Sequence, residues 1–215
     1  MILIKNSQIL RLCALLLGAT ALSGCLGNDI QGAVTSAAFD EALEEVQGRV
    51  PTSDMPLVGT ASYRGATKLT GTGQALGGEV FGEINLDVDF GAAADEAITG
   101  TASNFIGNLD GVDYDIEGTL STSDAFPTAL AVVESTITLP TGGTQNIATG
   151  SVLINMTGDV TANGETRGVL LSLGGAFVGP GGEAIHGVAG LQPLTSVVGV
   201  AGPSVGSGTW FVVQD

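Results

Sequence analysis

The sequence has 215 residues, with 22 aspartates and glutamates against six lysines and arginines and a formal net charge of −16 at pH 7. This length fits one domain or at most two, and all-β barrels commonly use such a length as a single domain. The acidic excess repels phosphate backbones and anionic lipid headgroups, so it argues against a nucleic-acid partner and against direct contact with an anionic membrane surface.

Residues 1–24 have the layout of a secretory signal peptide. Two cations, Lys5 and Arg11, precede an apolar run from Leu12 to Leu17, and small residues follow before Cys25. The apolar run is too short for a membrane span. The four residues Leu22-Ser23-Gly24-Cys25 resemble the lipobox of bacterial lipoproteins, and an ordinary signal peptide with a chance cysteine is the alternative.

The lipobox resemblance implies lipid attachment at Cys25, with diacylglycerol on the thiol, cleavage before the residue and acylation of the new amine. Several acyl chains on one residue give stable anchoring, since each buried methylene contributes about 0.8 kcal/mol. By the same resemblance, Leu26 in place of an aspartate favours the outer membrane of a Gram-negative cell. The surface-exposed and periplasmic sides of that membrane both stay open.

Removal of the signal changes the cysteine inventory and the charge. Cys13 lies in the signal and Cys25 carries the lipid, so we expect no free thiol for a disulfide, a metal site or nucleophilic catalysis. The mature chain keeps 22 acidic residues and four cations, which gives a formal net charge of −18. We interpret this acidity as a source of solubility and edge protection, with a basic partner protein or a cation as the alternative.

Residues 25–56 are expected to form the lipidated N-terminus, a short helix and a linker. Apolar residues recur every three to five positions with acidic residues between them, which predicts an amphipathic helix from about Val34 to Gln47, ended by Gly48. The stretch PTSDMP at residues 51–56 is predicted to be a linker. Helix and linker form either a stalk between lipid and domain or, alternatively, a helix packed against the domain.

Residues 57–215 show the period-two pattern of β-strands. Between Ile84 and Phe90 apolar residues alternate with asparagine and aspartate, which predicts antiparallel strands with one dry and one wet face. The dipeptides Asp110-Gly111 and Asn163-Gly164 predict tight hairpin turns. The expected strands are residues 59–64, 78–90, 97–106, 112–120, 128–139, 151–160, 168–177, 185–191 and 209–213.

Such a chain of strands predicts an all-β fold, a single eight-stranded antiparallel up-and-down β-barrel, because closure removes exposed sheet edges. A β-sandwich is an alternative, although the sequence lacks the cysteine pair and tryptophan placement of immunoglobulin domains. A transmembrane barrel is another alternative. A lipid anchor would be redundant there, and the acidic strand faces would have to line a very narrow lumen.

The stretch from Gly174 to Leu191 reads as a strand, a sharp reversal at Gly179-Pro180 and a second strand. It contains the pattern G-x-F-x-G-P-x-x-E-x-x-x-G, formed by Gly175, Phe177, Gly179, Pro180, Glu183 and Gly187. This pattern resembles the closing signature of the β-barrel domain of transferrin-binding protein B and its relatives, a fold group that includes factor H binding protein. Tyr63-Arg64-Gly65, Asp89-Phe90 and Ile98-Thr99-Gly100 resemble that domain's early strands, so the similarity covers about residues 57–213.

The family resemblance implies an eight-stranded barrel on a surface or outer-membrane lipoprotein that binds a host protein or a haem carrier. The chain has room for one barrel and almost no handle domain, and no partner-binding residue of the family matches a position here. We therefore expect the six signature residues to shape the fold, with Phe177 filling the core. The ligand-binding residues stay unknown.

Catalysis has little support, so we predict a protein that is not an enzyme and needs no cofactor or metal. His186 is the only histidine, which rules out a choice of general base or a multi-histidine zinc site. For haem, His186, Met156 and Tyr63 are the weak axial-ligand candidates. Asp87 and Asp89 share a strand face but need only strand pairing to explain them, and Asn108–Asp115 is predicted to be a hairpin turn instead of a calcium loop.

The sequence thus predicts a lipid-anchored outer-membrane or surface lipoprotein that acts as a binding module for a protein or carrier partner, with a link to iron or haem acquisition by family resemblance. The alternative is a structural or interaction lipoprotein of the envelope without a diffusible ligand.

Overall fold

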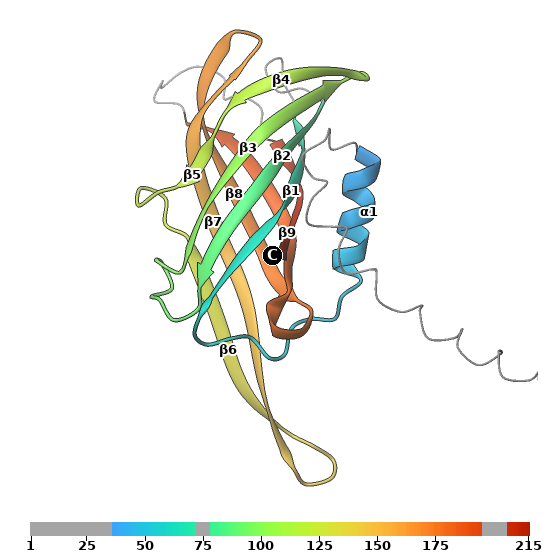
Figure 1. Ribbon diagram of the computed structural model, residues 1–215, viewed down its shortest axis with the longest axis vertical. Coiled ribbons are helices and arrows are strands. Elements are labelled where there is room, and N and C mark those ends of the chain that lie inside the picture. Colours follow the sequence, from blue (N-terminus) through green and yellow to red (C-terminus); the bar gives the residue numbers. More distant parts are fainter. Residues whose placement is uncertain (1–35, 72–77, 195–205) are drawn as a thin grey trace, which may run out of the picture.

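The computed structural model describes residues 36–71, 78–194 and 206–215. Within these ranges the chain forms one α-helix, a short 3-10 turn and ten strands, and all the strand pairings are antiparallel (Figure 1). The elements are α1 (Ser36–Gln47), β1 (Thr60–Gly71), β2 (Gly78–Asp89), β3 (Ile98–Leu109), β4 (Val112–Gly118), β5 (Leu120–Thr122), β6 (Ala129–Thr138), β7 (Thr144–Ala162), β8 (Glu165–Val178), η1 (Pro180–Gly182), β9 (Ala184–Pro193) and β10 (Gly206–Gln214). The prediction of a mainly antiparallel β fold is confirmed.

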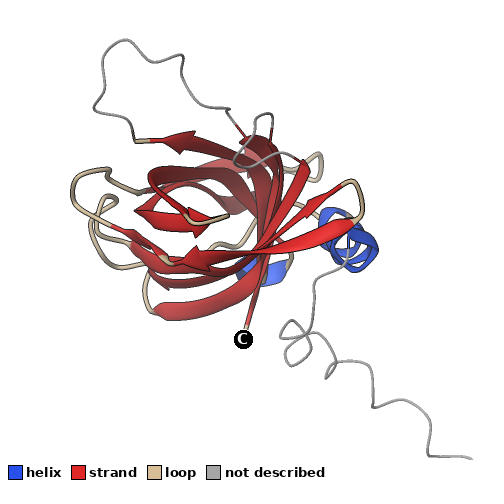
Figure 2. Ribbon diagram, turned by 90° about the horizontal axis from the view of Figure 1, so that it is seen from above, coloured by secondary structure: helices blue, strands red, loops and turns tan. Residues whose placement is uncertain are grey.

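The strands form one sheet that closes into a ring, as Figure 2 shows from above. Its order is β2-β1-β10-β9-β8-β7-β4-β3-β5, and the ring closes because β2 also pairs with β3. The ring is not a regular barrel. Both β4 and β5 lie between β3 and β7, and β6 pairs only with β7 among the described strands.

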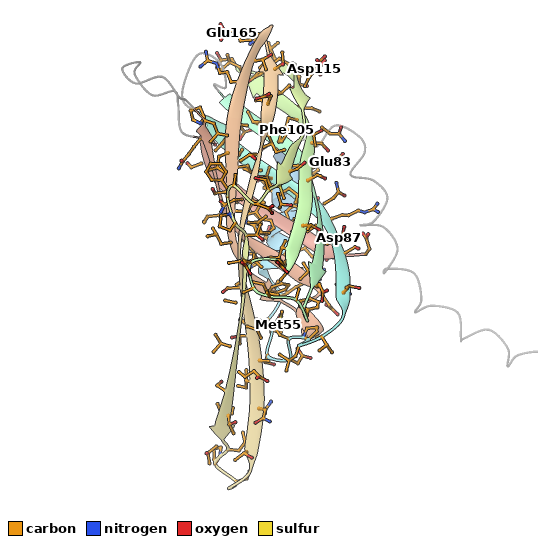
Figure 3. All side chains as sticks on the ribbon, turned by 90° about the vertical axis from the view of Figure 1, so that its left-hand side faces the viewer. Met55, Glu83, Asp87, Phe105, Asp115 and Glu165 are labelled. Atoms are coloured by element: carbon orange, nitrogen blue, oxygen red, sulfur yellow. The ribbon has the colours of Figure 1, made fainter. Side chains whose placement is uncertain are left out.

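The inside of the ring is apolar, and the outward positions of β2 are polar. On β2, Ile84, Leu86 and Val88 are at most 2% exposed and belong to the main core cluster, whereas Asp87 and Asp89 are exposed. Figure 3 shows Asp87 and Glu83 on the outside of the sheet. Burial of one such aliphatic side chain stabilises the fold by about 1.5–3 kcal/mol, so this alternation fixes which face of each strand points inward.

Both predicted hairpin turns are confirmed. Leu109 pairs with Val112 and Ala162 with Glu165, which leaves two residues in each turn. The two central residues of each turn have positive φ, with Asp110 at 52°, Gly111 at 82°, Asn163 at 53° and Gly164 at 78°. Positive φ at both positions defines the type I′ turn, whose twist matches that of the flanking strands.

Several strands differ in length from the prediction. β1 continues to Gly71, and β7 begins at Thr144, where the sequence predicted a start at residue 151. The predicted strand 112–120 is divided after Gly118, whose φ of 136° is accessible mainly to glycine and ends β4. These differences arise because strand pairing, more than local alternation, decides where a strand ends.

The helix α1 packs on the outside of the sheet (Figure 2), so of the two alternatives for this region the packed helix is correct. Phe39 and Val46 are both 1% exposed, and the Phe39 ring lies 6.2 Å from that of Phe81 and 5.3 Å from that of Phe211. The helix ends at Gln47, as predicted, and the predicted start at Val34 lies outside the described residues. No helix in the described ranges is long and apolar enough to cross a membrane.

An ion-pair network also ties α1 to the sheet. Lys68 on β1 lies 3.0 Å from Asp40 and 3.3 Å from Glu79, and it also donates a hydrogen bond to the Ser36 hydroxyl at 2.7 Å. Burial lowers the pKa of Lys68, but hydrogen bonds to Asp40 and Glu79 outweigh this effect and leave the pKa above its ordinary value.

The linker predicted at residues 51–56 packs against the sheet. Thr52 and Met55 are 2% and 4% exposed, and the backbone of this segment bonds to β7 and β8. Pro51 forms a bridge with Val178, and Asp54 forms one with Ala148. Met55 belongs to the main core cluster and lies toward one end of the ring (Figure 3), so the segment helps to cover that end.

Candidate functional site: a neutral outer face

The signature residues lie where β8 turns into β9. Gly175 and Phe177 belong to β8, Gly187 belongs to β9, and the other three form the turn between them. Cys25, the predicted site of lipid attachment, lies outside the described residues. Phe177 is 2% exposed and its ring lies 6.1 Å from those of Tyr63 and Phe90, so it fills the core as expected.

The two strand glycines of the signature allow the neighbouring backbone and the ring of Trp210 to lie close to them. Gly175 and Gly187 are direct partners across β8 and β9. A Cβ on Gly187 would lie 1.9 Å from the carbonyl oxygen of Gly174, and one on Gly175 would lie 2.9 Å from the Trp210 ring. The Trp210 indole is fully buried and donates a hydrogen bond to the Gly174 oxygen at 3.1 Å. Neither glycine can be replaced without displacing backbone or this ring.

The turn itself is held by the segment before β1. The Thr52 hydroxyl donates to the Gly179 oxygen at 2.8 Å, and the Gly181 amide donates to the Asp54 carboxylate at 2.8 Å. The Tyr63 hydroxyl donates to the Gly182 oxygen at 2.9 Å, and burial raises the pKa of Tyr63 to about 12. The signature therefore stabilises the turn that closes the fold, and the backbone groups of Gly179, Gly181 and Gly182 named here already have partners within the domain.

The three weak haem-ligand candidates do not come together. Met156 and Tyr63 are buried in the interior, at 0% and 1% exposure. His186 alternates with the core residue Ile185 and pairs with Phe211, which places it on the outer face near α1. Within the described ranges no group of three or more histidine, cysteine, aspartate or glutamate side chains could hold a metal ion.

The acidic candidates have local partners. Asp87 accepts a hydrogen bond from Ser62 at 2.6 Å, and Asp89 accepts one from the amide of Gly91 at 2.9 Å. In the hairpin at residues 108–115, Asn108 donates to Asp113 at 2.6 Å and accepts from the turn amide of Gly111 at 3.2 Å. These contacts are those of strand pairing and of a hairpin turn, in agreement with the prediction for both places.

The feature that the sequence reading missed is an uneven distribution of charge around the ring. Between Asp124 and Asp159 the chain has a single charged residue, Glu134, and from residue 168 to residue 194 only Glu183 is charged. By contrast, β2 and β4 carry acidic residues at many outward positions, such as Asp87 and Asp115. The outside of the ring therefore has an acidic side and an uncharged side.

We call the uncharged side the neutral face. Strand register defines it, because residues that pair directly across neighbouring strands point to the same side of a sheet. Its outward-pointing residues are Ala129, Ala131, Val133, Ser135 and Ile137 on β6, Ile147, Thr149, Ser151 and Leu153 on β7, Gly174 and Ala176 on β8, and Val188 on β9.

Exposed apolar side chains gather on the neutral face. Leu153, Gly174 and Val188 form one row across three strands, with Leu153 and Val188 exposed to 49% and 69%. Among the described residues, Val188 has the only side chain within 4 Å of the Cβ position of Gly174, at 3.8 Å, so the centre of the row is open. On β6, Val133 and Ile137 extend the apolar surface at 62% and 40% exposure.

Exposed aliphatic residues on an uncharged sheet face are typical of contact surfaces for other molecules, since isolated soluble domains rarely place several together. The signal that identifies this face in the sequence is the long stretch with one charge, read together with the strand pairing. The alternation of apolar and polar residues along each strand predicts that Leu153 and Val188 point outward. It does not show that the pairing of three strands brings them into one row.

Comparison with family models, with curated proteins and with solved structures finds no significant match. The family resemblance of residues 57–213 thus stays a prediction, and the neutral face is the feature from which a function can be argued.

Proposed function

We propose that this protein is a lipid-anchored binding module of the outer membrane or cell surface, which holds a protein or carrier partner on its neutral face. The observation that carries the proposal is the row Leu153-Gly174-Val188, where two exposed apolar side chains flank a glycine on an uncharged surface. Iron or haem acquisition is the role that the family resemblance favours. The proposed activity is binding and not catalysis.

The proposal includes a finer description of the fold, an eight-stranded up-and-down barrel. Both β4 and β5 pair with β3 on one side and β7 on the other, which supports treating them as one interrupted strand. Eight positions then remain in the ring, and β6 stands outside it as half of a hairpin arm. Side chains such as Leu171, Ile154 and Met156, each fully buried, support a filled interior.

The polarity of the ring supports a domain that lies in water beside the membrane. In transmembrane barrels the apolar side chains face outward and the polar ones line the interior. Here Ile84 and Leu86 point inward, whereas Asp87 and Asp89 point outward. A lipid at Cys25 would then supply the membrane attachment that the outer surface of the ring does not provide.

The test is capture of a partner by the full-length protein and by two charge variants. Val188→Glu places a carboxylate on the neutral face, and Val112→Glu places one at an equally exposed valine, 68% exposed, on the β3–β4 hairpin. We expect the wild type and Val112→Glu to recover the same stoichiometric soluble partner from cells of the producing organism. Recovery by Val188→Glu should fall at least tenfold, because a buried unpaired charge costs well over 1.4 kcal/mol.

Two outcomes would contradict the proposal. Equal recovery by all three proteins would place the partner elsewhere on the surface. Recovery of envelope components alone would favour the alternative, a structural or interaction lipoprotein without a diffusible ligand. Protease treatment of intact cells then decides between the surface-exposed and periplasmic sides.

A further inference from the structure

The β6–β7 hairpin arm offers an edge strand with unpaired backbone. Beyond the end of the ring β6 and β7 continue as a two-stranded ribbon, which Figures 1 and 3 show as a long arm. In the described part of the chain β6 has a strand neighbour on one side only. An edge of this kind is a template for a further strand.

The hydrogen bonds at both ends of β6 show which residues face that open edge. The Leu130 amide donates to Ala94 at 2.9 Å, away from β7, whereas the Leu139 amide bonds within the hairpin to Gly143 at 2.7 Å. Backbone groups alternate in direction along a strand, so even-numbered residues point to the open edge. Within the described ranges, the backbone groups of Val132, Glu134, Thr136 and Thr138 have no strand partner on that side.

The charge of the chain limits what can add to this edge. The whole chain carries a formal charge of −16, and the arm contains only one charged residue, Glu134. A basic partner would be attracted to the acidic side of the ring instead of to the arm. A partner that is itself acidic meets the least repulsion here, and a second copy of this chain is such a partner.

We propose that two copies of this chain pair through their β6 strands, antiparallel and edge to edge, with the two-fold axis at Ser135. In this register Glu134 lies opposite Thr136 of the second copy, so no carboxylate faces another, and Val132 lies opposite Thr138. On the neutral face Val133 lies opposite Ile137, which joins two exposed apolar side chains across the interface. An axis at Glu134 would place two carboxylates directly opposite each other.

The pairing extends the neutral faces of two copies into one continuous surface. The four residues of each β6 whose backbone groups face the open edge exchange hydrogen bonds with those of the second copy. Apolar side-chain contacts on the neutral face add to these bonds. This inference goes beyond the proposed partner binding and does not depend on it, because it uses the arm edge and not the row at Gly174.

Disulfide trapping tests the register. Ser135 occupies a non-hydrogen-bonded position of the proposed pair, where Cα atoms lie about 4.5 Å apart, within the range that a disulfide spans. Full-length Ser135→Cys should form a reducible dimer under mild oxidation, several-fold above the wild type, which carries Cys13 and Cys25 as a baseline. Ser151→Cys is the matched control, an exposed serine on the same face of β7.

A second variant tests whether backbone pairing holds the copies together. Thr136→Pro removes an amide that points to the open edge and leaves the backbone hydrogen bonds between β6 and β7 intact, while it also removes the exposed side-chain hydrogen bond from Thr136 to Asn146. In the Ser135→Cys background it should reduce the dimer to the level of the control, with an unchanged Trp210 fluorescence spectrum. Equal dimer yields from Ser135→Cys and Ser151→Cys would overturn the inference, and so would a yield that Thr136→Pro leaves unchanged. If either of these results occurs while Val188→Glu still loses partner capture, the self-pairing is refuted and the proposed partner binding is not.

Discussion

The packing of α1 predicts that the helix is part of the β domain and not a stalk. Phe39→Ala removes a ring that is 1% exposed and lies against Phe81 and Phe211. Truncation of a buried phenylalanine costs about 3–5 kcal/mol, and we expect the lower part of this range because the site lies at the edge of the fold. For a slope of about 2 kcal/mol per molar urea, the midpoint of unfolding should fall by about 1.5 M.

The assay is urea unfolding followed by tryptophan fluorescence. Trp210 is the only tryptophan and is fully buried in the core of the ring, so its signal reports on the sheet and not on the helix. Glu41→Ala, an exposed position on the same helix, is the control and should stay within about 0.5 kcal/mol of the wild type. A midpoint for Phe39→Ala equal to that of Glu41→Ala would refute cooperative docking of the helix.

Three further predictions concern the closing turn, the core and the anchor. Gly187→Ala places a Cβ 1.9 Å from a backbone oxygen of β8 and should abolish folding or cost several kcal/mol of stability. Gly190→Ala should be tolerated, because no described atom lies within 4 Å of the Cβ position of Gly190. Circular dichroism and the urea midpoint of unfolding distinguish the two variants. Burial raises the pKa of Tyr63 from 10.0 to about 12, so the contribution of Tyr63 to stability should be constant below pH 10 and fall between pH 10 and 12, where ionisation favours the unfolded chain. Stability measured in this window should fall less in Tyr63→Phe. Cys25→Ser should leave the protein in the soluble fraction or unprocessed. Membrane fractionation that the substitution leaves unchanged, together with no radiolabelled palmitate in the wild type, would contradict lipid anchoring.

Much of the fold could be predicted from local patterns in the sequence. The strand with alternating Ile84, Leu86 and Val88 and the two turns at Asp110-Gly111 and Asn163-Gly164 were predicted correctly, because alternation and positive φ are properties of a few neighbouring residues. The end of α1 was found for the same reason, since Gly48 directly follows the last helical residue.

What the sequence did not reveal depends on contacts between distant residues. The segment at residues 51–56 has the composition of a linker, yet Thr52 bonds to the turn at Gly179, 127 positions away. Lys68 lies beyond the predicted strand at residues 59–64, yet it joins α1 to β2 through Asp40 and Glu79. Local propensity contains no information about such partners, so the closed end of the ring and the packed helix emerge only in three dimensions.

The binding surface that we propose, the neutral face, is separate from the signature around the closing turn. The signature around Gly179 is occupied by its own hydrogen bonds and by the packing of Phe177, so substitution there changes stability before it changes binding. The row at Gly174 lies one position from the signature glycine Gly175 but points to the opposite side of β8, outward where Gly175 faces Trp210. Substitution of an outward residue of β8 can therefore leave the packing of the closing turn unchanged. Gly174→Glu, which has space at its Cβ position, should preserve the urea midpoint while it eliminates capture, a combination that Gly175→Glu cannot give.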